Sequence, residues 1–387
     1  MGDSSRHLLK SLINASEKAA NIARICRSNE QLLGLLVQEK TGDEANARFE
    51  HDFKTLADVL IQESIKHDVG AEFPEMKENI KGEESSTFKN AEDESVAIVV
   101  GANETETADC LLQILQTQHQ EAAQILAEEV HRSVEFDKEL HEDFPELPND
   151  VDYSQLGIWI DPIDATAEYI SGDTMFTNFP GITSTGLDCV TVLIGVYDLS
   201  SGLPVIGVIS QPFGNKIEDN IYNSALYWGI ALPDLQAHSK RLDSETNRSR
   251  LLGIFSSSER ADLLQQMLDL GYEFAFSAGA GHKALKVITG EVDVYVLSKA
   301  STFKWDTCAP QAILRSLNGD IIDFKNSIKE GKAIPLTYTT AAASENSEEG
   351  GDETEGTDKD WKCNCNGLIA IKDLKLLEHL LEKLAES

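Results

Sequence analysis

Two aspartates near the middle of the chain have the types and spacing of a metal-binding pair. Residues 159–166 read WIDPIDAT, so an apolar run leads directly into Asp161 and Asp164. Proline fixes the backbone between the two acids, and close carboxylates repel each other unless a proton or a cation lies between them. Mg²⁺ binds a few hard oxygens and keeps its other positions for water and phosphate, and the carbonyl of Ile163 could complete such a shell. The plainer alternative is a turn whose acids cap the following helix.

Four more acids could join this pair only if the fold brings distant stretches together. Glu83 and Glu84 follow a glycine in KGEES, Asp306 lies in KWDTCAP, and Asp58 lies in LAD. Taken alone, each has a plainer interpretation. The glutamates can belong to an exposed acidic turn, and Asp58 can be an exposed helical acid. Asp306 can be a helix N-cap, with Pro310 in the first turn.

A run of small residues, SAGAGHK at 277–283, precedes a helical pattern. Small residues leave N–H groups accessible at a helix start, which suits a hydroxyl or a phosphate, and Lys283 adds positive charge. A plain loop-to-helix turn fits this stretch equally well. We expect His282 to lie at the rim and not to act as a general base. The sequence has no nucleophile elbow, so we predict no Ser/His/Asp or Cys/His triad.

The composition excludes several classes of partner. Lys and Arg total 33 against 66 Asp and Glu, a net charge of −33. A field of that sign repels nucleic acid and anionic membranes, so we expect neither as a partner. An anionic substrate would need bound divalent metal to reverse the field locally. The six cysteines lack the paired spacing of a zinc site, so we expect reduced thiols. Because there is no bilayer-spanning apolar run and residues 1–6 lack a signal core, we expect a cytoplasmic protein.

Hydrophobic periodicity places these motifs among both helices and strands. Apolar residues recur at three- and four-residue steps from Leu8 to Cys26 and around Leu56, which predicts helices. Further helices are predicted at residues 121–134, 260–270, 283–289, 309–317 and 374–384. Strands are predicted at residues 96–100, 157–160, 190–197, 205–209, 251–255, 292–297 and 368–371. The alternation in the second half predicts strands covered by helices.

Residues 344–360 (SENSEEGGDETEGTDKD) form an acidic, low-complexity stretch. It cannot bury enough apolar surface to order itself, so we predict a solvated surface loop. Calcium binding is less favoured, because the D-x-D-x-D-G spacing is missing.

Taken in this order, the motifs resemble those of the lithium-sensitive, magnesium-dependent phosphomonoesterases, which include inositol monophosphatases, bisphosphate nucleotidases and fructose bisphosphatases. The D-P-I-D-x-T stretch and the W-D pair are specific to that superfamily. Longer stretches resemble its branch that removes the 1-phosphate from inositol polyphosphates: residues 16–24, 52–60, 156–159, 192–198 and 302–306. The resemblance covers most of the chain and fails over residues 344–360, which look like an insertion.

By position, the resemblance implies a set of metal-binding residues: Asp58, Glu83, Glu84, Asp161, Ile163 through its carbonyl, Asp164 and Asp306. Asp58 would hydrogen-bond Thr166 and help to order a metal-bound water, so we expect Asp58, Thr166 and Glu83 to act in catalysis. A second set would contact the substrate: Asp164, Ala165, Thr166, Ser258, Arg260, Gly279, Ala280 and Lys283. Arg260 stands where we expect a lysine, which keeps the charge but changes the geometry of the contact.

The resemblance also implies the fold and the reaction. The fold is a layered αβαβα sandwich: an N-terminal α+β region (residues 1–210) carries the metal-binding acids, and a C-terminal α/β region (211–387) carries the substrate-facing loops and the insertion. The reaction is direct attack of metal-activated water on an inositol polyphosphate such as inositol 1,4-bisphosphate or inositol 1,3,4-trisphosphate. Two or three Mg²⁺ would be the cofactors, and Li⁺ would inhibit by replacing one of them. We expect a monomer that acts in phosphatidylinositol signalling.

Two other functions stay open on the sequence alone. One is a 3′,5′-bisphosphate nucleotidase on the same scaffold. The other is a non-catalytic protein that binds inositol phosphates. Every acid that the resemblance requires is present, which disfavours the second alternative.

Overall fold

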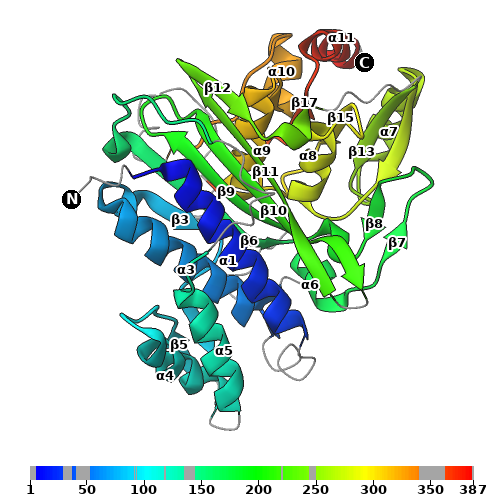
Figure 1. The fold of residues 1–387 in the computed structure, drawn as a ribbon. Coiled ribbons are helices and arrows are strands. Elements are labelled where there is room, and N and C mark those ends of the chain that lie inside the picture. Colours follow the sequence, from blue (N-terminus) through cyan, green and yellow to red (C-terminus); the bar gives the residue numbers. More distant parts are fainter. Residues whose placement is uncertain are drawn as a thin grey trace, which may run out of the picture.

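The structure, a computed structural model, describes residues 6–28, 37–40, 53–90, 92, 94–116, 119–134, 144–218, 221–243, 250–339 and 362–385. In this part of the chain, helices and sheets alternate in five layers, with helices outside both sheets and between them (Figure 1). Three clusters of buried apolar side chains fill the spaces between the layers. The predicted αβαβα sandwich is confirmed.

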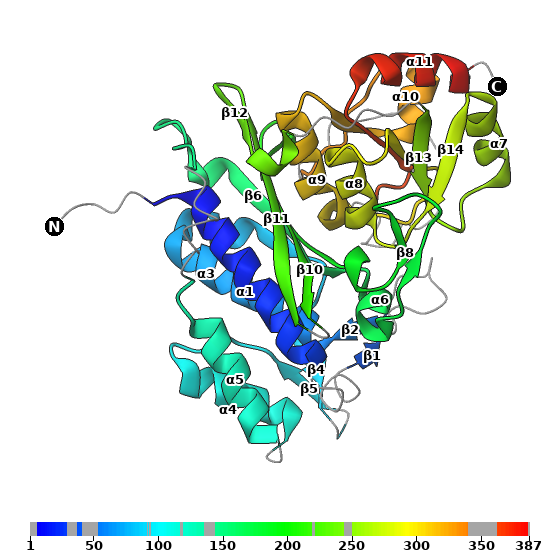
Figure 2. The same ribbon diagram turned by 45° about the vertical axis from the view of Figure 1, so that its right-hand side comes forward.

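The first layer contains two long helices, α1 (Leu8–Ser28) and α3 (Leu56–Glu72). The apolar residues of α1 recur every three or four positions, and its periodic face is buried in the first core cluster, as predicted. A second pair, α4 (Glu104–Leu115) and α5 (Gln120–His131), lies beside α1 at the far end of the molecule from the second sheet (Figure 2). The predicted strand at residues 96–100 is a short one, β5 (Ser95–Ala97), which pairs with β4 (Thr87–Lys89).

The central sheet has six strands in the order β12-β11-β10-β9-β6-β3. They are β3 (Ile80–Gly82), β6 (Leu156–Asp164), β9 (Thr191–Asp198), β10 (Pro204–Glu218), β11 (Ile221–Leu232) and β12 (Leu235–His238). Only β3 and β6 pair in parallel. Every residue of β6 is buried, because helices cover both faces of the sheet at this strand.

Two helices lie between the sheets, α8 (Ala280–Ile288) and α9 (Lys304–Ser316). Helix α9 crosses the central sheet closely because glycines replace side chains beneath it. A Cβ at Gly195 would lie 2.5 Å from the Ala309 nitrogen, and one at Gly207 would lie 2.2 Å from the Ala309 oxygen. The helix begins five residues earlier than predicted, so Pro310 lies inside it and not in its first turn.

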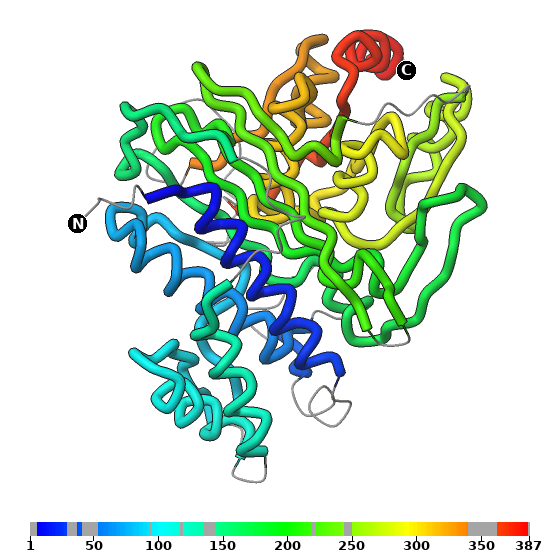
Figure 3. Tube along the Cα trace, in the orientation of Figure 1, coloured from blue at the N-terminus to red at the C-terminus, as the bar shows by residue number. Residues whose placement is uncertain are grey.

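The second sheet has five strands in the order β14-β13-β15-β17-β16. They are β13 (Leu251–Phe255), β14 (Tyr272–Phe276), β15 (Val294–Leu297), β16 (Asp320–Asp323) and β17 (Leu368–Ile371). The outermost layer covers its other face: α7 (Ala261–Asp269), α10 (Phe324–Glu330) and α11 (Leu374–Ala385). Figure 3 follows the chain from the first layer through the central sheet to this outer layer.

The expected boundary at residue 210 falls inside β10 and is not where the central sheet ends. That sheet continues to His238, and the second sheet begins at Leu251. The chain passes from one sheet to the other between these two points; residues 244–249, like 344–360, lie outside the described residues. Among the described helices, none has both the length and the apolar content to cross a membrane. All six cysteines are free thiols, as predicted.

Candidate active site

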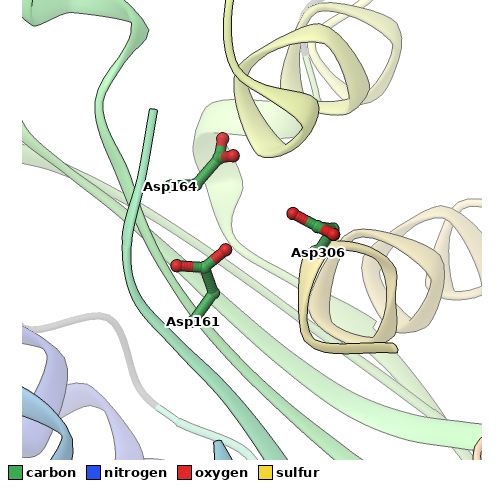
Figure 4. Close-up of side chains that lie close together, drawn as sticks. All are labelled: Asp161, Asp164 and Asp306. Carbon is green, nitrogen blue, oxygen red and sulfur yellow. The ribbon is translucent and has the colours of Figure 1, made fainter. Parts of the chain in front are cut away.

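Asp161 and Asp164 lie at the carboxyl end of β6, where its pairing with β9 becomes irregular. The strands pair regularly from Leu156 to Asp161, and the register then shifts before Asp164 pairs with Thr191. Residues three apart on a regular strand face opposite sides of the sheet. The shift, which includes Pro162, turns both carboxylates toward the same space. Figure 4 shows the two side chains together beside Asp306.

Asp306 reaches that space from the first turn of α9. Its Oδ2 accepts a hydrogen bond from the Phe303 N–H at 2.5 Å. Phe303 is thus the N-cap and Asp306 the third residue of the helix, so the plainer interpretation of Asp306 as the N-cap is wrong. One carboxylate oxygen from each of Asp161, Asp164 and Asp306 lies within 4.8 Å of the other two. The fold thus brings Asp306 to a pair of acids that precede it by more than 140 residues in the chain.

Burial and mutual repulsion raise the pKa of these carboxyl groups. The pKa of Asp161 lies well above its ordinary value because the group is buried and faces Glu83 and Asp164. Burial likewise raises the pKa of Asp306 well above normal, with Asp164 and Glu83 adding to the effect. Burial also raises the pKa of Asp164, but the Lys283 ammonium opposes it. Such a cluster ionises fully only when a cation lies within it.

Glu83 and Glu84 follow β3 directly. The Glu83 N–H donates to the Ile160 carbonyl at 3.1 Å, which continues the parallel pairing and places Glu83 near Asp161. Gln62 of α3 holds the next residue from both sides. Its amide donates to the Glu84 carbonyl at 2.6 Å and accepts from the Glu84 N–H at 2.9 Å. A Cβ on Gly82 would collide with the Gln62 side chain, so glycine here lets Gln62 hold Glu84 in this way.

Lys40 is a site residue that the sequence analysis missed. Its ammonium lies 2.7 Å from Glu83 Oε1 and 2.6 Å from Glu84 Oε1, and its side chain is only 4% exposed. It reaches the glutamates because β1 (Val37–Glu39) pairs with β2 (Phe53–Thr55) just before α3. Nothing around residue 40 marks a lysine as part of a site, so only the fold reveals it.

Asp58 lies at the start of α3, close to the acids of β6. Its Oδ2 accepts from the Thr55 N–H at 2.7 Å and from the Thr55 hydroxyl at 2.5 Å. Burial raises the pKa of Asp58 to about 7, against the Thr55 hydroxyl and Lys40, which lower it. Its Oδ1 is buried and has no hydrogen-bond partner in the described part of the chain.

The expected hydrogen bond between Asp58 and Thr166 is wrong in this structure. The Thr166 hydroxyl donates instead to the Ile163 carbonyl at 3.1 Å, a short-range bond that threonine at a helix start favours. Ala165, just before α6 (Thr166–Ser171), adopts φ 69°, so the chain turns sharply away from Asp164. A carbonyl has two lone pairs, so Ile163 keeps one for another ligand.

The small-residue loop at α8 holds Asp164 from the far side. The Ala280 N–H donates to Asp164 Oδ1 at 3.2 Å, and the Gly281 N–H donates to Oδ2 at 2.8 Å. Gly279 has φ 73°, and a Cβ there would lie 2.8 Å from a carbonyl oxygen. The N–H groups of Ala280 and Gly281 thus orient an acid, where we expected this loop to face substrate. Gly281 was not predicted as a site residue.

Lys283 and His282 are both buried, contrary to expectation. Lys283 does not face open space, since its ammonium donates to the Gly279 carbonyl at 2.7 Å and to the Ser277 carbonyl at 3.2 Å. Its charge acts on Asp164 from inside the protein. His282 is 1% exposed and so is not a rim residue. The helix was predicted to begin only at residue 283, so its periodicity did not show that His282 and Lys283 face the interior.

Ser258 and Arg260 lie on the exposed loop that follows β13. This loop adjoins the small-residue loop, because the Ser277 N–H donates to the Phe255 carbonyl at 3.1 Å. Arg260 is paired with Asp262 and turns to solvent in this structure. Glu259, which was not predicted, is buried between them and accepts from the Ser298 N–H at 3.0 Å.

The donor set fits hard divalent cations. Asp161 Oδ1 and Asp58 Oδ1 are buried oxygens that no described donor satisfies. Buried carboxylate oxygens without partners are costly unless a proton or a cation reaches them. All ligands here are oxygens, without thiol or imidazole, which is the set that Mg²⁺ prefers.

Comparison with known proteins is consistent with this geometry. A family model described as "Inositol monophosphatase family" matches residues 60–355. The human protein named inositol polyphosphate 1-phosphatase is 38% identical over 98% of this chain and 97% of its own length. The human 3′(2′),5′-bisphosphate nucleotidase 1 is 28% identical over 53% of this chain and 65% of its own length.

Solved structures give the same fold. The extragenic suppressor protein suhB from Bartonella henselae superposes with a TM-score of 0.50 at 15% sequence identity. The alignment covers 97% of this chain and 98% of that one.

Proposed function

We propose a function from one premise: the chain belongs to the inositol monophosphatase family. It is a phosphoric monoester hydrolase that uses Mg²⁺ to remove the 1-phosphate from inositol polyphosphates. The observation that carries this proposal is the convergence of Asp161, Asp164 and Asp306 within 4.8 Å. Three buried acids at this spacing repel one another, and they suit a site that holds cations against a phosphate ester.

The likeness to named relatives supports the choice of substrate. The relatives named inositol polyphosphate 1-phosphatase, from human and mouse, match over 98% of this chain at 38% identity. The match to the bisphosphate nucleotidases is shorter and less similar. Inositol 1,4-bisphosphate and inositol 1,3,4-trisphosphate are therefore the proposed substrates.

The residues of the site have different roles in hydrolysis. Asp161, Asp164 and Asp306 hold the cations, with Glu83 and the Ile163 carbonyl as further ligands. Bound Mg²⁺ supplies Lewis acidity toward the phosphate and lowers the pKa of water. The free Oδ1 of Asp58 accepts a proton from the attacking water and orients it.

The phosphate and the ring lie on the outer side of these acids. The N–H groups at the start of α6, after Ala165, face the phosphate, and the Thr166 hydroxyl holds the Ile163 carbonyl in place. Water oxygen bonds to phosphorus, and the ester oxygen leaves as the inositol hydroxyl after taking a proton. The loop with Ser258 and Arg260, next to Gly279, faces the rest of the substrate.

Finer points of the proposal follow from family membership. Two or three Mg²⁺ act together, with Glu84 near the last of them, and Li⁺ inhibits by replacing one. The enzyme is a monomer of the cytoplasm and acts in phosphatidylinositol signalling. Its net charge of −33 supports the absence of nucleic acid and anionic membrane among its partners.

A phosphate-release assay tests the proposal. With Mg²⁺ present, inositol 1,4-bisphosphate is expected to be hydrolysed with a higher kcat/KM than adenosine 3′,5′-bisphosphate. Asp161→Asn should lower kcat about 10²- to 10³-fold, because it removes a charged ligand from the site. Asp109→Asn, on the exposed face of α4, is the matched control and should leave kcat unchanged.

Each alternative has its own outcome in that assay. Preference for the adenosine bisphosphate would make the chain a nucleotidase. Binding without hydrolysis of either compound by the parent would make it a non-catalytic binder. An Asp161→Asn variant that hydrolyses as fast as the parent would refute catalysis at this site.

A further inference from the structure

A second hollow lies behind α8, away from the acids. It is a cavity of about 410 Å³ bounded by the β7–β8 hairpin, by β10 and β11, and by α8; β7 is Met175–Phe176 and β8 is Thr183–Thr185. None of Asp161, Asp164 and Asp306 lines it. Its volume falls within the range of small-molecule sites.

His282 is the feature of this cavity that the fold does not explain. It lines the cavity, is 1% exposed, and has no hydrogen-bond partner for either ring nitrogen among the described residues. The backbone of Asp188 acts electrostatically on the ring, but neither ring nitrogen has a partner with hydrogen-bond geometry among the described residues. Burial, followed by Lys286 and Lys283, holds the pKa of His282 well below normal. The neutral ring therefore offers one donor and one acceptor.

The remaining lining sets the charge that a ligand would meet. Two cations, Arg241 and Lys286, are matched by two anions, Asp188 and Glu291. Lys286 is paired with Glu291 at 2.9 Å. The local charge is thus balanced, while the chain as a whole carries −33, so nothing here selects a charged ligand over a neutral one.

The polar and apolar groups that line the cavity indicate which class of ligand it suits. Hydroxyl and amide groups, including those of Thr183 and Gln211, line one part, and the rings of Phe176 and Phe179 line another. Phe176 is 77% exposed, so the face of its ring is accessible to a ligand at the edge of the cavity. Polar groups of both donor and acceptor type beside an apolar ring face suit a molecule with hydroxyls at its edge and C–H groups on its face.

We propose that this cavity binds a neutral polyhydroxylated ring, either a cyclitol or a pyranose sugar, with its hydroxyls on His282 and Gln211 and its face on Phe176. The site is separate from the acid cluster and does not depend on the function proposed above. The two lie on opposite sides of the first turn of α8, since Ala280 and Gly281 hold Asp164 while His282 lines the cavity.

Ligand-observed NMR and calorimetry on the full chain in EDTA test this proposal, with myo-inositol and glucose as the two probes. At least one probe should bind saturably, with a dissociation constant on the order of 1 mM for a ligand of this size. The probe that binds identifies the cyclitol or the sugar as the ligand class. Absence of saturable binding by both would overturn the proposal.

Two variants locate the binding. His282→Phe keeps the ring shape and removes both nitrogens, so it should weaken binding about tenfold or more without lowering Tm. Phe176→Ser should weaken binding several-fold, whereas Met175→Ser, exposed on the same hairpin but outside the cavity, should not. His379→Phe, on the exposed face of α11, is the control for His282→Phe. Unchanged binding in both cavity variants would overturn the assignment, and loss in the Phe176 variant supports it even if His282→Phe fails to fold.

Discussion

At the scale of single residues, the fold holds the acids of the site buried and close together, where their negative charges repel one another. Asp58 and Asp161 each present a buried oxygen without a partner. Lys40 and Lys283 offset part of the negative charge, one beside the glutamates and one behind Asp164. Two buried ammonium groups face six acids, so the remaining negative charge is left for divalent cations to neutralise.

The raised pKa values predict how stability without metal depends on pH. A carboxyl whose pKa is raised in the folded state stabilises the fold in its protonated form. For Asp58 this contribution is fully present below its ordinary pKa of 3.8 and is lost as pH rises through about 7. The pKa values of Asp161 and Asp306 are also raised well above normal. These two groups therefore extend the loss of folding stability to higher pH.

Tm in EDTA should therefore fall between pH 5 and pH 8, and added Mg²⁺ should restore more of it at pH 8 than at pH 5. Thermal denaturation with and without Mg²⁺ measures both effects. In the Asp161→Asn variant, Tm in EDTA should fall less steeply as pH rises. A Tm in EDTA that rises across this interval would contradict the picture of mutually repelling acids.

At the scale of elements, the site depends on how closely α9 crosses the central sheet. Asp306 meets the acids of β6 only because Gly195 and Gly207 let the backbone at Ala309 approach the strands. The register shift at Pro162 is equally necessary, since it turns Asp161 and Asp164 to one side.

Gly207→Ala should therefore act on both stability and metal binding. Its Cβ would meet the Ala309 oxygen at 2.2 Å, so α9 must move. We expect a loss of about 1–3 kcal/mol in the free energy of unfolding and weaker Mg²⁺ binding, measured by urea denaturation and by calorimetry. The matched control is Gly70→Ala in α3, where the nearest atom is a flexible lysine carbon at 3.3 Å. Destabilisation with unchanged Mg²⁺ affinity would show that α9 does not set the spacing of the site.

The elements also show how far the sequence could predict the site. The local spacing of Asp161 and Asp164 is enough to predict a metal-binding pair. Asp306 and Asp58 are recognised only because their motifs occur in the same order as those of the family. Lys40 leaves no local signal because its role comes from strand pairing. β11 was not predicted, because Ile221–Leu232 mixes polar and apolar residues along a strand that is only partly buried. The direction of His282 and Lys283 depends on what packs around the start of α8, which the periodicity of the predicted helix at 283–289 does not specify.

At the scale of the whole molecule, the ligands come from different layers. β6 in the central sheet carries Asp161 and Asp164, and α9 between the sheets carries Asp306. The first layer contributes Asp58 through α3. In the proposed site, a cation bound by Asp161, Asp164 and Asp306 would link two of the five layers, and Asp58 would add the first layer through the attacking water; the α4–α5 pair lies apart (Figure 2).

Mg²⁺ should accordingly slow amide hydrogen exchange in selected places. We expect added protection at the end of β6 and in the first turns of α3 and α9, because the cation holds these elements together. Exchange in α4 and α5 should stay unchanged, which serves as the internal control. Protection spread evenly over all helices would indicate general salt stabilisation and not a site.

The most direct test of the central claim is anomalous scattering from a crystal of the protein soaked in Mn²⁺, which can replace Mg²⁺ at oxygen ligands. The account predicts at least one anomalous peak bonded to carboxylate oxygens of Asp161, Asp164 and Asp306. An ordered, empty cluster in crystals that bind Mn²⁺ elsewhere would contradict it.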